Sequence, residues 1–540
     1  MRGTIYIAVS LCALLGAGTP LSADPGYGAD DLAVVNRIGW GVTASEMADV
    51  EHQGLDAWLE AQLHPPADDG LPAAALAEIN TLPALHKSGL ALFVEEQARF
   101  EAAQTQQRQM QAQKLAAAMP ESMSMSAATM PPNAAPAKAM TDPLSLSPQQ
   151  VRQAYFRDVQ RQATTRTLLR ALYSPWQLRE TMSWFWFNHF NVFVDKGAIR
   201  LFLADYEDRA IRPNALGNFR KLLEATLRSP AMLQYLDNAQ NAMGHINENY
   251  AREIMELHTM GVGSGYTQKD VQELARILTG VSIVPPRLAG ANPARLAPGA
   301  IRDGAFAFYP ARHDFGDKLF LGHVIKGSGY GEVQQALDIL CAQPATAQHI
   351  SKQIAQYFVS DAPPPALVYR MAQRWQETGG NIAAVLDIMF HSPEFRASLG
   401  QPLLKDPMHY VLSAVRMAYD DRVVVNTAPI NNWLYGLSEP LYGHLTPDGY
   451  PLERSAWNGP GQIEARFEIA RAIGSGAAGL FKADAPQAQA QPAFPLLQGA
   501  LYYQGLANTL APPTRTALAQ ATSPQEWNIF FLASPDFMRR

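Results

Sequence analysis

The segment from Asn247 to His258 holds the chain's densest set of side chains suited to chemistry. On a helix that turns about 100° per residue, Asn249, Arg252, Glu253 and Glu256 share one polar arc. Two carboxyl groups one turn apart can perform acid–base catalysis or share a metal ion. We therefore predict that Glu253 and Glu256 are catalytic, and that Arg252 orients them or binds an anionic substrate group.

A second interpretation of this segment requires no chemistry. Arg252 can pair with Glu248 and Glu256 across one helical turn on a solvated face, and each such pair stabilises a helix by about 0.3–0.5 kcal/mol. The same helical wheel places Met260 on the polar arc and Leu257 on an apolar face. Spacing by itself leaves both interpretations open.

Histidines supply candidate ligands for a divalent metal. Four consecutive aromatic residues end at Phe187, just before His189, which is either a ligand or a hydrogen-bonded histidine of a core or groove. His313 stands beside an aspartate in a predicted loop, where the pair could bind a metal or orient a substrate. The candidate metal ligands are His189, His258, His313 and Asp314. The remaining candidates for a polar cleft are Asn188, Asn247, Glu248 and Asn249.

The common catalytic templates are absent from the sequence, which contains no GxSxG, HExxH, CxxC or EF-hand pattern. Gly327, Gly329 and Gly331 precede a predicted helix in the manner of a phosphate-binding loop. Their spacing is GxGxG, however, and Glu332 would repel a phosphate, so we expect no nucleotide site there. Residues 448–451, Asp-Gly-Tyr-Pro, are typical of a tight turn.

Residues 1–23 have the order of a secretory signal peptide. Arg2 precedes an apolar run from Ile5 to Ala17, and Leu21-Ser22-Ala23 offers a small residue for cleavage. A membrane anchor is the alternative, but a spanning helix needs about 20 apolar residues. We expect a periplasmic or secreted protein with no stable membrane span after cleavage. Loss of Arg2 would change the net charge from −6 to −7, and this mild acidity argues against nucleic-acid binding.

The rest of the chain is predicted to form a mainly α, multi-helical globular fold with a few short strands. We expect an N-terminal helical segment of the core at 24–100, the main helical domain at 151–480, a linker at 481–495 and a C-terminal helical segment packed on the core at 496–540. Within the main domain, helices are predicted at 151–173, 178–190, 215–227, 247–260, 268–279, 332–341, 346–358, 364–377 and 381–390.

Residues 101–150 differ in composition, because Gln, Ala, Met, Ser and Pro dominate and large apolar groups are few. Such a segment buries too little apolar surface to offset its ordering entropy, so we predict a disordered or frayed-helix insertion that is dispensable for folding. Clustered methionines outside the cytoplasm can bind Cu(I), and a tolerated linker is the alternative. The methionines are Met110, Met119, Met123, Met125, Met130 and Met140.

Local signals predict where several elements begin. Thr267 followed by Asp270 predicts a helix with a capping box. Ser-Pro pairs that start at residues 229, 392 and 534 predict new helices, with Ser as the cap and Pro at the first helical position. The run from Phe320 to Ile325 predicts a strand.

Taken together, these segments resemble the bacterial family called Domain of Unknown Function 1800. The family's FW-x-NHF segment is matched by residues 185–190, and its NENYARELMELHTLG segment by residues 247–261. Further similar segments are 35–41, 265–268, 278–280, 313–314, 392–395 and 448–451. Relatives often have His where this chain has Phe187, and some have Phe in place of His258. The resemblance therefore implies a functional polar cleft in which Glu253 and Glu256 are the safer candidates.

Two functional hypotheses follow. The first is an exported enzyme, with or without a metal, that uses the Glu-rich helix in a polar cleft. The second is a non-catalytic accessory or scaffold protein, in which the aromatic run at 184–187 anchors a partner. The resemblance implies an exported sulfatase-like protein as that partner. Burial distinguishes the two, because the enzyme needs the glutamates in a pocket and the scaffold needs the aromatic residues exposed.

Overall fold

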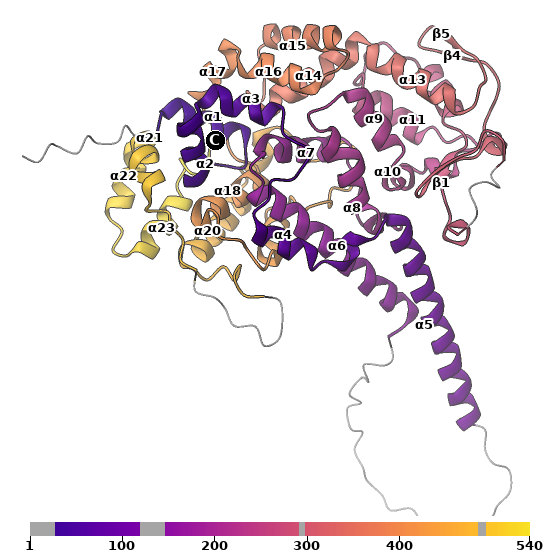
Figure 1. Cartoon of the computed structure of the whole chain (residues 1–540), viewed down its shortest axis with the longest axis horizontal. Coiled ribbons are helices and arrows are strands. Elements are labelled where there is room, and N and C mark those ends of the chain that lie inside the picture. The colour runs from indigo at the N-terminus through magenta and orange to yellow at the C-terminus, as the bar shows by residue number, and fades with distance from the viewer. Residues whose placement is uncertain (1–26, 119–145, 291–296, 484–492) are drawn as a thin grey trace, which may run out of the picture.

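The computed structural model describes residues 27–118, 146–290, 297–483 and 493–540. Helices dominate these residues, and Figure 1 shows most of them packed together, with one long helix projecting. The prediction of a mainly α fold with a few short strands is confirmed. The predicted signal peptide, most of the predicted linker and five of the six clustered methionines lie outside the described residues.

The α-helices follow one another along the whole described chain. In order they are α1 (Ala29–Ile38), α2 (Ala44–Gln53), α3 (Leu55–Leu63), α4 (Ala73–Asn80), α5 (Gly89–Ala118), α6 (Pro148–Tyr173), α7 (Gln177–His189), α8 (Leu203–Asp205), α9 (Phe219–Leu227), α10 (Pro230–Tyr235), α11 (Asn249–Glu253), α12 (Gln268–Ile277), α13 (Tyr330–Ala342), α14 (Pro344–Phe358), α15 (Pro365–Thr378), α16 (Ile382–Phe390), α17 (Pro393–Leu399), α18 (Pro407–Tyr419), α19 (Ala428–Gly436), α20 (Pro460–Gly474), α21 (Ala507–Thr509), α22 (Pro512–Ala519) and α23 (Pro524–Leu532). Three π-helical turns are η3 (Tyr206–Ile211), η6 (Ile254–His258) and η11 (Tyr502–Leu506).

The strands form two small antiparallel sheets. They are β1 (Val281–Ile283), β2 (Ile301–Asp303), β3 (Phe306–Phe308), β4 (Lys318–Phe320) and β5 (His323–Ile325). Strand β3 lies between β1 and β2, while β4 and β5 form a hairpin. The predicted single strand from Phe320 to Ile325 is thus wrong, because Leu321 and Gly322 both have positive φ and form a turn.

The helix starts predicted at Thr267, Ser229 and Ser392 are confirmed, and the one predicted at Ser534 is wrong. The Thr267 side chain accepts a hydrogen bond from the Asp270 N–H, and the Asp270 carboxylate accepts one from the Thr267 N–H. The side chains of Ser229 and Ser392 accept from the N–H groups of Ala231 and Phe395 and so cap α10 and α17, each with Pro at the first helical position. The Ser534 hydroxyl accepts from the Phe537 N–H, but residues 535–538 form a turn rather than a helix. Short polar side chains before apolar helices therefore fix these boundaries.

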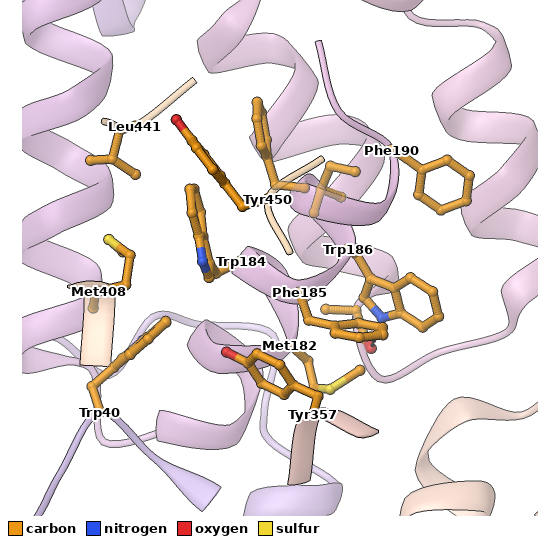
Figure 2. Packing of buried hydrophobic residues seen from close by; sticks show 14 of the residues in the cluster. Trp40, Met182, Trp184, Phe185, Trp186, Phe190, Tyr357, Met408, Leu441 and Tyr450 are labelled. Carbon is orange, nitrogen blue, oxygen red and sulfur yellow. Dashed lines mark hydrogen bonds between the residues drawn. The ribbon is translucent and has the colours of Figure 1, made fainter. Parts of the chain in front are cut away.

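Helix α7 lies at the centre of the body and contacts α1, α3 and α6. Figure 2 shows its side chains packed among residues from distant parts of the chain. The Trp184 ring lies 6.4 Å from that of Tyr450, the Phe185 ring lies 5.3 Å from that of Tyr357, and Trp186 donates to the Ala215 carbonyl at 2.9 Å. The core thus holds the Asn-His pair at the end of α7 in a fixed place.

The predicted regular helix over 247–260 is wrong in its second half. Helix α11 begins at Asn249, and the chain changes to the π-helical turn η6 at Ile254. A π-helical turn accommodates an extra residue, so a wheel at about 100° per residue fails beyond this point. As a result Met260 is buried, and Leu257 turns from the apolar face toward a pocket.

Two further observations complete the fold. Helix α5 continues to Ala118, so part of the segment predicted as a disordered or frayed insertion is helical, and this helix projects from the body in Figure 1. Near the other end of the chain, α23 packs on α20, and the Arg540 side chain donates to the carbonyls of Arg37 and Tyr357. Among the described residues, no helix has the length and apolarity needed to cross a membrane.

Candidate functional site

A pocket of about 520 Å³ opens where α7, η6, α14 and the loop at 444–452 meet. We call it the site pocket. Of the residues predicted from the sequence, Asn188, His189 and Glu256 line it. The other lining residues that matter below are Phe185, Leu257, Met260, Gly261, His349, Lys352, Gln353, Asp448, Tyr450 and Leu452.

Two asparagines at the end of α7 hold the 444–452 loop in place. The Asn188 side chain donates to the Tyr450 carbonyl at 2.9 Å and accepts from the Tyr450 N–H at 2.6 Å. Asn191 donates to the carbonyls of His444 and Thr446 at 3.0 and 2.8 Å. The Asn-His and Asp-Gly-Tyr-Pro motifs, far apart in sequence, are therefore one hydrogen-bonded unit.

The approach of this loop to α7 requires glycine at position 449. Gly449 has φ of 73°, and a Cβ built there would lie 2.2 Å from the Asn188 carbonyl oxygen. Any side chain would push the loop away from the end of α7. The tight turn predicted at 448–451 thus brings Asp448 to the site pocket.

The end of η6 supplies carbonyl groups to two histidines. A helix leaves its last carbonyls without partners inside the helix. His189 Nε2 bonds the His258 carbonyl oxygen at 3.1 Å, and His349 bonds the Leu257 carbonyl. The Nε2 atom of His349 is buried without a partner. The π-helical turn therefore orients both imidazoles that line the site pocket.

Both of these histidines are neutral at pH 7. Burial lowers the pKa of His189 to about 3, and the nearby His349 adds to the fall. Burial also lowers the pKa of His349, against its hydrogen bond to the Leu257 carbonyl. A neutral imidazole that donates one N–H to a carbonyl keeps a lone pair on its other nitrogen.

Three carboxyl groups act on one another at this site: Glu256 and Asp448, which line the site pocket, and Glu253. Burial raises the pKa of Glu253, the charge of Glu256 raises it further, Arg252 opposes the rise and Asp448 adds to it. Glu256 accepts a hydrogen bond from the Tyr266 hydroxyl. Glu253 itself is half-buried and stands one turn before Glu256 rather than in the pocket wall.

Arg252 faces outward from this group. It pairs with Glu248 at 3.2 Å and with Glu256 at 3.4 Å, and it donates to Gln268 at 2.9 Å. Its side chain is 37% exposed. The solvated i,i+4 pairs of the second interpretation are therefore present, and Arg252 holds Glu256 from outside the site pocket.

Asn247 and Asn249, predicted for a polar cleft, instead hold backbone. The Asn247 side chain accepts from the Asn249 N–H at 2.9 Å, and the Asn249 side chain donates to the Leu236 carbonyl at 3.3 Å. Neither they nor Glu248 line the site pocket. Their amide groups fix the start of α11 and so the direction of the Glu-rich segment.

His258 lies behind the pocket wall. It is 1% exposed, and neither ring nitrogen has a hydrogen-bond partner. Burial lowers its pKa well below the ordinary value, and His189, whose ring centroid is 5.9 Å away, adds to this fall. The structure thus brings these two predicted ligands together, but His258 takes no part in the pocket lining.

His313 and Asp314 belong to a different cluster. His313 bonds the Thr279 carbonyl through Nδ1 at 2.8 Å and Glu332 through Nε2 at 2.9 Å. Both oxygens of Asp314 accept from Arg276, at 2.8 and 3.2 Å. Both ring nitrogens of His313 are thus engaged in this structure, and its role as a metal ligand stays a prediction. Its sequence neighbours gave no sign of this, because Thr279 and Glu332 come from distant segments.

No metal site is evident in the described ranges. They contain no group of three or more His, Cys, Asp or Glu side chains placed to hold a metal ion. The aromatic run at 184–187 is also not exposed, since its four residues are 7%, 2%, 0% and 2% accessible. It is part of the core and cannot serve as a surface anchor.

Sequence reasoning missed the face of α14 that forms the opposite wall. His349, Lys352 and Gln353 line the site pocket from this helix, at the spacing of one helical face. The helix was predicted at 346–358 without a functional role. The spacing of these three polar residues at i, i+3 and i+4, on one face of the helix, was the signal that could have found it.

Comparison with known proteins identifies a family but no characterised relative. A family model described as "Protein of unknown function (DUF1800)" matches residues 33–539. No curated protein and no solved structure matches the chain.

Proposed function

The chain belongs to the DUF1800 family, and we propose that it is an exported enzyme that performs acid–base catalysis in the site pocket. The observation that carries the proposal is the position of Glu256. This carboxyl lines a pocket of about 520 Å³ together with Asp448 and a neutral histidine, His189, and its charge raises the pKa of Glu253. Ordinary surface glutamates have no such surroundings.

The carboxyl groups differ in environment, which suits them to different roles. Glu253 has a raised pKa because it is partly buried beside like charges. Asp448 instead lies 3.3 Å from His444 Nε2 and accepts a hydrogen bond from the Thr446 hydroxyl. Carboxyl groups in different environments can divide the roles of acid and base toward a substrate.

Glu256 is the proposed acid–base group in contact with substrate, and Glu253 is a positioning residue that acts through it. Arg252 and Tyr266 fix the Glu256 carboxyl from two sides. The apolar lining, which includes Leu257, Met260 and Leu452, fits the body of an organic substrate. The proposed catalytic groups are side chains of the protein itself.

The test is a screen of the purified chain against chromogenic esters, amides, glycosides and phosphates. For any substrate turned over, Glu256→Gln is expected to lower kcat/KM at least about 100-fold, the usual range for loss of an acid–base group. Glu224→Gln is the matched control, because Glu224 has 24% side-chain exposure against 26% for Glu256 and also pairs with arginines at i,i+4.

The outcome that contradicts the proposal is a substrate whose kcat/KM is the same in Glu256→Gln and in the native chain. Elemental analysis of the same untagged protein adds a second measurement. A stoichiometric metal that is lost in Glu256→Gln would replace protein acid–base catalysis with metal-assisted chemistry.

A further inference from the structure

A second, smaller cavity lies directly behind the wall of the site pocket. Its volume is about 20 Å³, and four residues line both spaces: Phe185, Asn188, Tyr450 and Leu452. We call it the inner cavity. A water molecule needs about 10–15 Å³ of such space, so the inner cavity has room for one water molecule but not for an organic ligand.

Two carboxyl groups line the inner cavity, and their surroundings differ. Both oxygens of Asp406 are held by His409, one by its backbone N–H at 2.8 Å and the other by Nδ1 at 2.7 Å. Glu439 is 3% exposed, accepts a hydrogen bond from the Met408 N–H at 3.0 Å and forms no ion pair with any described residue. A buried carboxylate without a cation is strongly unfavourable, so Glu439 keeps its proton beside the charged Asp406.

The pKa values of the two carboxyl groups support this assignment. Burial raises the pKa of Glu439 well above its ordinary value, and the charge of Asp406 raises it further. The Met408 N–H and Arg466 oppose this rise with smaller effects. Burial also opposes the ionisation of Asp406, but the contacts from His409 outweigh it and hold the pKa of Asp406 below its ordinary value. The inner cavity thus contains one carboxylic acid and one carboxylate.

Tyr357 adds a hydroxyl group that has no partner in the described chain. It lines the inner cavity from α14, its side chain is buried with the residue 6% exposed, and its hydroxyl oxygen makes no hydrogen bond. Figure 2 shows this hydroxyl on the side of the ring that faces Trp40 and Met408. A buried hydroxyl without a partner is unfavourable, so a small molecule that bonds it would be favoured.

We propose that the inner cavity binds one water molecule, which joins the protonated carboxyl of Glu439 to the hydroxyl of Tyr357. The water can accept the hydrogen bond of the Glu439 acid and donate to the Tyr357 oxygen, and its second hydrogen can reach a remaining lone pair of Asp406. Buried waters typically make about three hydrogen bonds, to polar groups that have no other partner.

A monatomic ion is the competing occupant of so small a space. Arg454 and Arg540 line the inner cavity together with the two carboxyl groups. A cation would be repelled by the guanidinium groups and an anion by the Asp406 carboxylate. A neutral molecule that both donates and accepts hydrogen bonds avoids both repulsions, and water is such a molecule.

The water and the Glu439 acid support the wall of the site pocket. Pro440, the next residue, accepts a hydrogen bond from the Tyr450 hydroxyl at 2.7 Å, and Tyr450 lines both cavities. Loss of the Glu439 proton would place a second negative charge beside Asp406 in an enclosed space. We therefore expect alkaline pH to weaken this wall, whether or not Glu256 is catalytic.

The charged and titratable groups around Glu439 come from several elements. They are Asp406 and His409 at the start of α18, Arg466 of α20, Tyr357 of α14, Tyr450 and Arg454 of the segment before α20, and Arg540.

Infrared difference spectroscopy in D₂O at pH 7 tests the protonation of Glu439. A protonated carboxylic acid has a C=O stretching band of its own, apart from those of carboxylates and amides. We expect this band in the native spectrum minus the Glu439→Gln spectrum. Glu224→Gln is the control without such a band, because Glu224 is ion-paired and 24% exposed. No band in the Glu439→Gln difference would overturn the proposal.

A crystal structure of the native chain at pH 7, at a resolution that shows ordered water, tests the ligand. We expect one water molecule within about 2.5–3.0 Å of both a Glu439 carboxyl oxygen and the Tyr357 oxygen. A direct hydrogen bond between these two side chains, a cavity without water, or an ion identified by anomalous scattering would each overturn the proposal. This measurement needs no variant, so it decides even if Glu439→Gln fails to fold.

Thermal unfolding at several pH values tests the consequence for stability. The pKa of Glu439 is raised in the folded state, so its contribution to stability is present below the unfolded value of about 4.3 and is lost as pH rises toward the folded value. Glutamine does not titrate, so the Tm of Glu439→Gln relative to the native chain should rise by at least about 2 °C from pH 5 to pH 8. A Tm difference that stays constant over this range, as expected for Glu224→Gln, would contradict the proposal.

Discussion

Two buried histidine clusters in this protein have opposite hydrogen-bonding states. Around His313, the side chains of His313, Lys318 and Glu332 are all inaccessible, and the polar atoms of the three engage one another or nearby backbone. Around the site pocket, His258 has two nitrogens without partners and His349 has one. Full satisfaction of polar groups marks a structural role, whereas buried groups left without partners mark a place where a ligand can contribute.

The largest expected effect tests the satisfied cluster. Lys318→Met should lower the free energy of unfolding by about 3–5 kcal/mol, because it leaves the Glu332 carboxylate buried without its cation. Lys326→Met is the matched control on the same hairpin, since Lys326 is 77% exposed and pairs with an exposed aspartate. Urea denaturation of both variants provides the measurement, and similar small losses in the two would contradict the structural role.

The sequence predicted most of this fold because its signals are local. Capping side chains such as Thr267 and Ser392, and the helical periodicity around them, act within a few residues. The role of His313 could not be predicted in the same way, because its partners lie 19 and 34 positions away. The π-helical turn at Ile254 was also hidden, since it depends on how the end of α11 packs, and it displaced Leu257 and Met260 from their expected faces.

The candidate site was half predictable for the same reason. Glu256, His189 and Asn188 stood out by residue type, and all three line the site pocket. His349 and Asp448 did not stand out, because only tertiary folding brings α14 and the 444–452 loop to η6. Polar sequence motifs can thus predict the residues of one pocket wall, but not the residues that distant segments contribute to the other walls.

The second-largest expected effect is a loss of unfolding free energy on acidification, which should begin at a higher pH for the site pocket than for the His313 cluster. The folded-state pKa of His189 is about 3, against about 6.5 in an unfolded chain. Its contribution to stability is therefore complete above pH 6.5 and is lost as pH falls toward 3. Between pH 7 and pH 5 this one group should cost about 2 kcal/mol of unfolding free energy.

His258→Leu provides the check on that loss. The pKa of His258 is lowered in the same direction, and neither of its nitrogens makes a hydrogen bond that the substitution would remove. Denaturation at pH 7 and pH 5 should show a smaller acid-induced loss in the variant than in the native chain. An identical loss in both would mean that His258 does not titrate on unfolding in this range.

Glu332 also loses its contribution to stability on acidification, but in a second, lower pH window. Burial opposes its ionisation, but hydrogen bonds from His313, Lys318 and two backbone N–H groups outweigh burial and hold the pKa of Glu332 below its ordinary value. Its contribution to stability is thus present above the unfolded pKa of about 4.3 and is lost as pH falls below that value. Acid should therefore affect the site pocket first and the His313 cluster only at lower pH.

The smallest expected effect concerns the stability of a catalytic variant. Glu256→Gln should change the unfolding free energy by less than about 0.5 kcal/mol, because Glu256 is partly exposed and its removal also relieves repulsion on Glu253. The measurement is thermal unfolding of Glu256→Gln and Lys318→Met under the same conditions, so that the two stability losses can be compared directly. A loss comparable to that of Lys318→Met would show that Glu256 is structural and would weaken the distinction between the clusters.

The glycine-rich turn before α13 has a consequence for ligands in solution. The N–H groups of Ser328 and Gly329 point at one oxygen of Glu332, at 2.7 and 2.9 Å, as they would at a phosphate oxygen. This carboxylate is tethered to the same turn, so its effective concentration far exceeds that of any free anion. The turn is an anion receptor permanently inhibited by its own chain, and nucleotides would have to displace a covalently attached competitor.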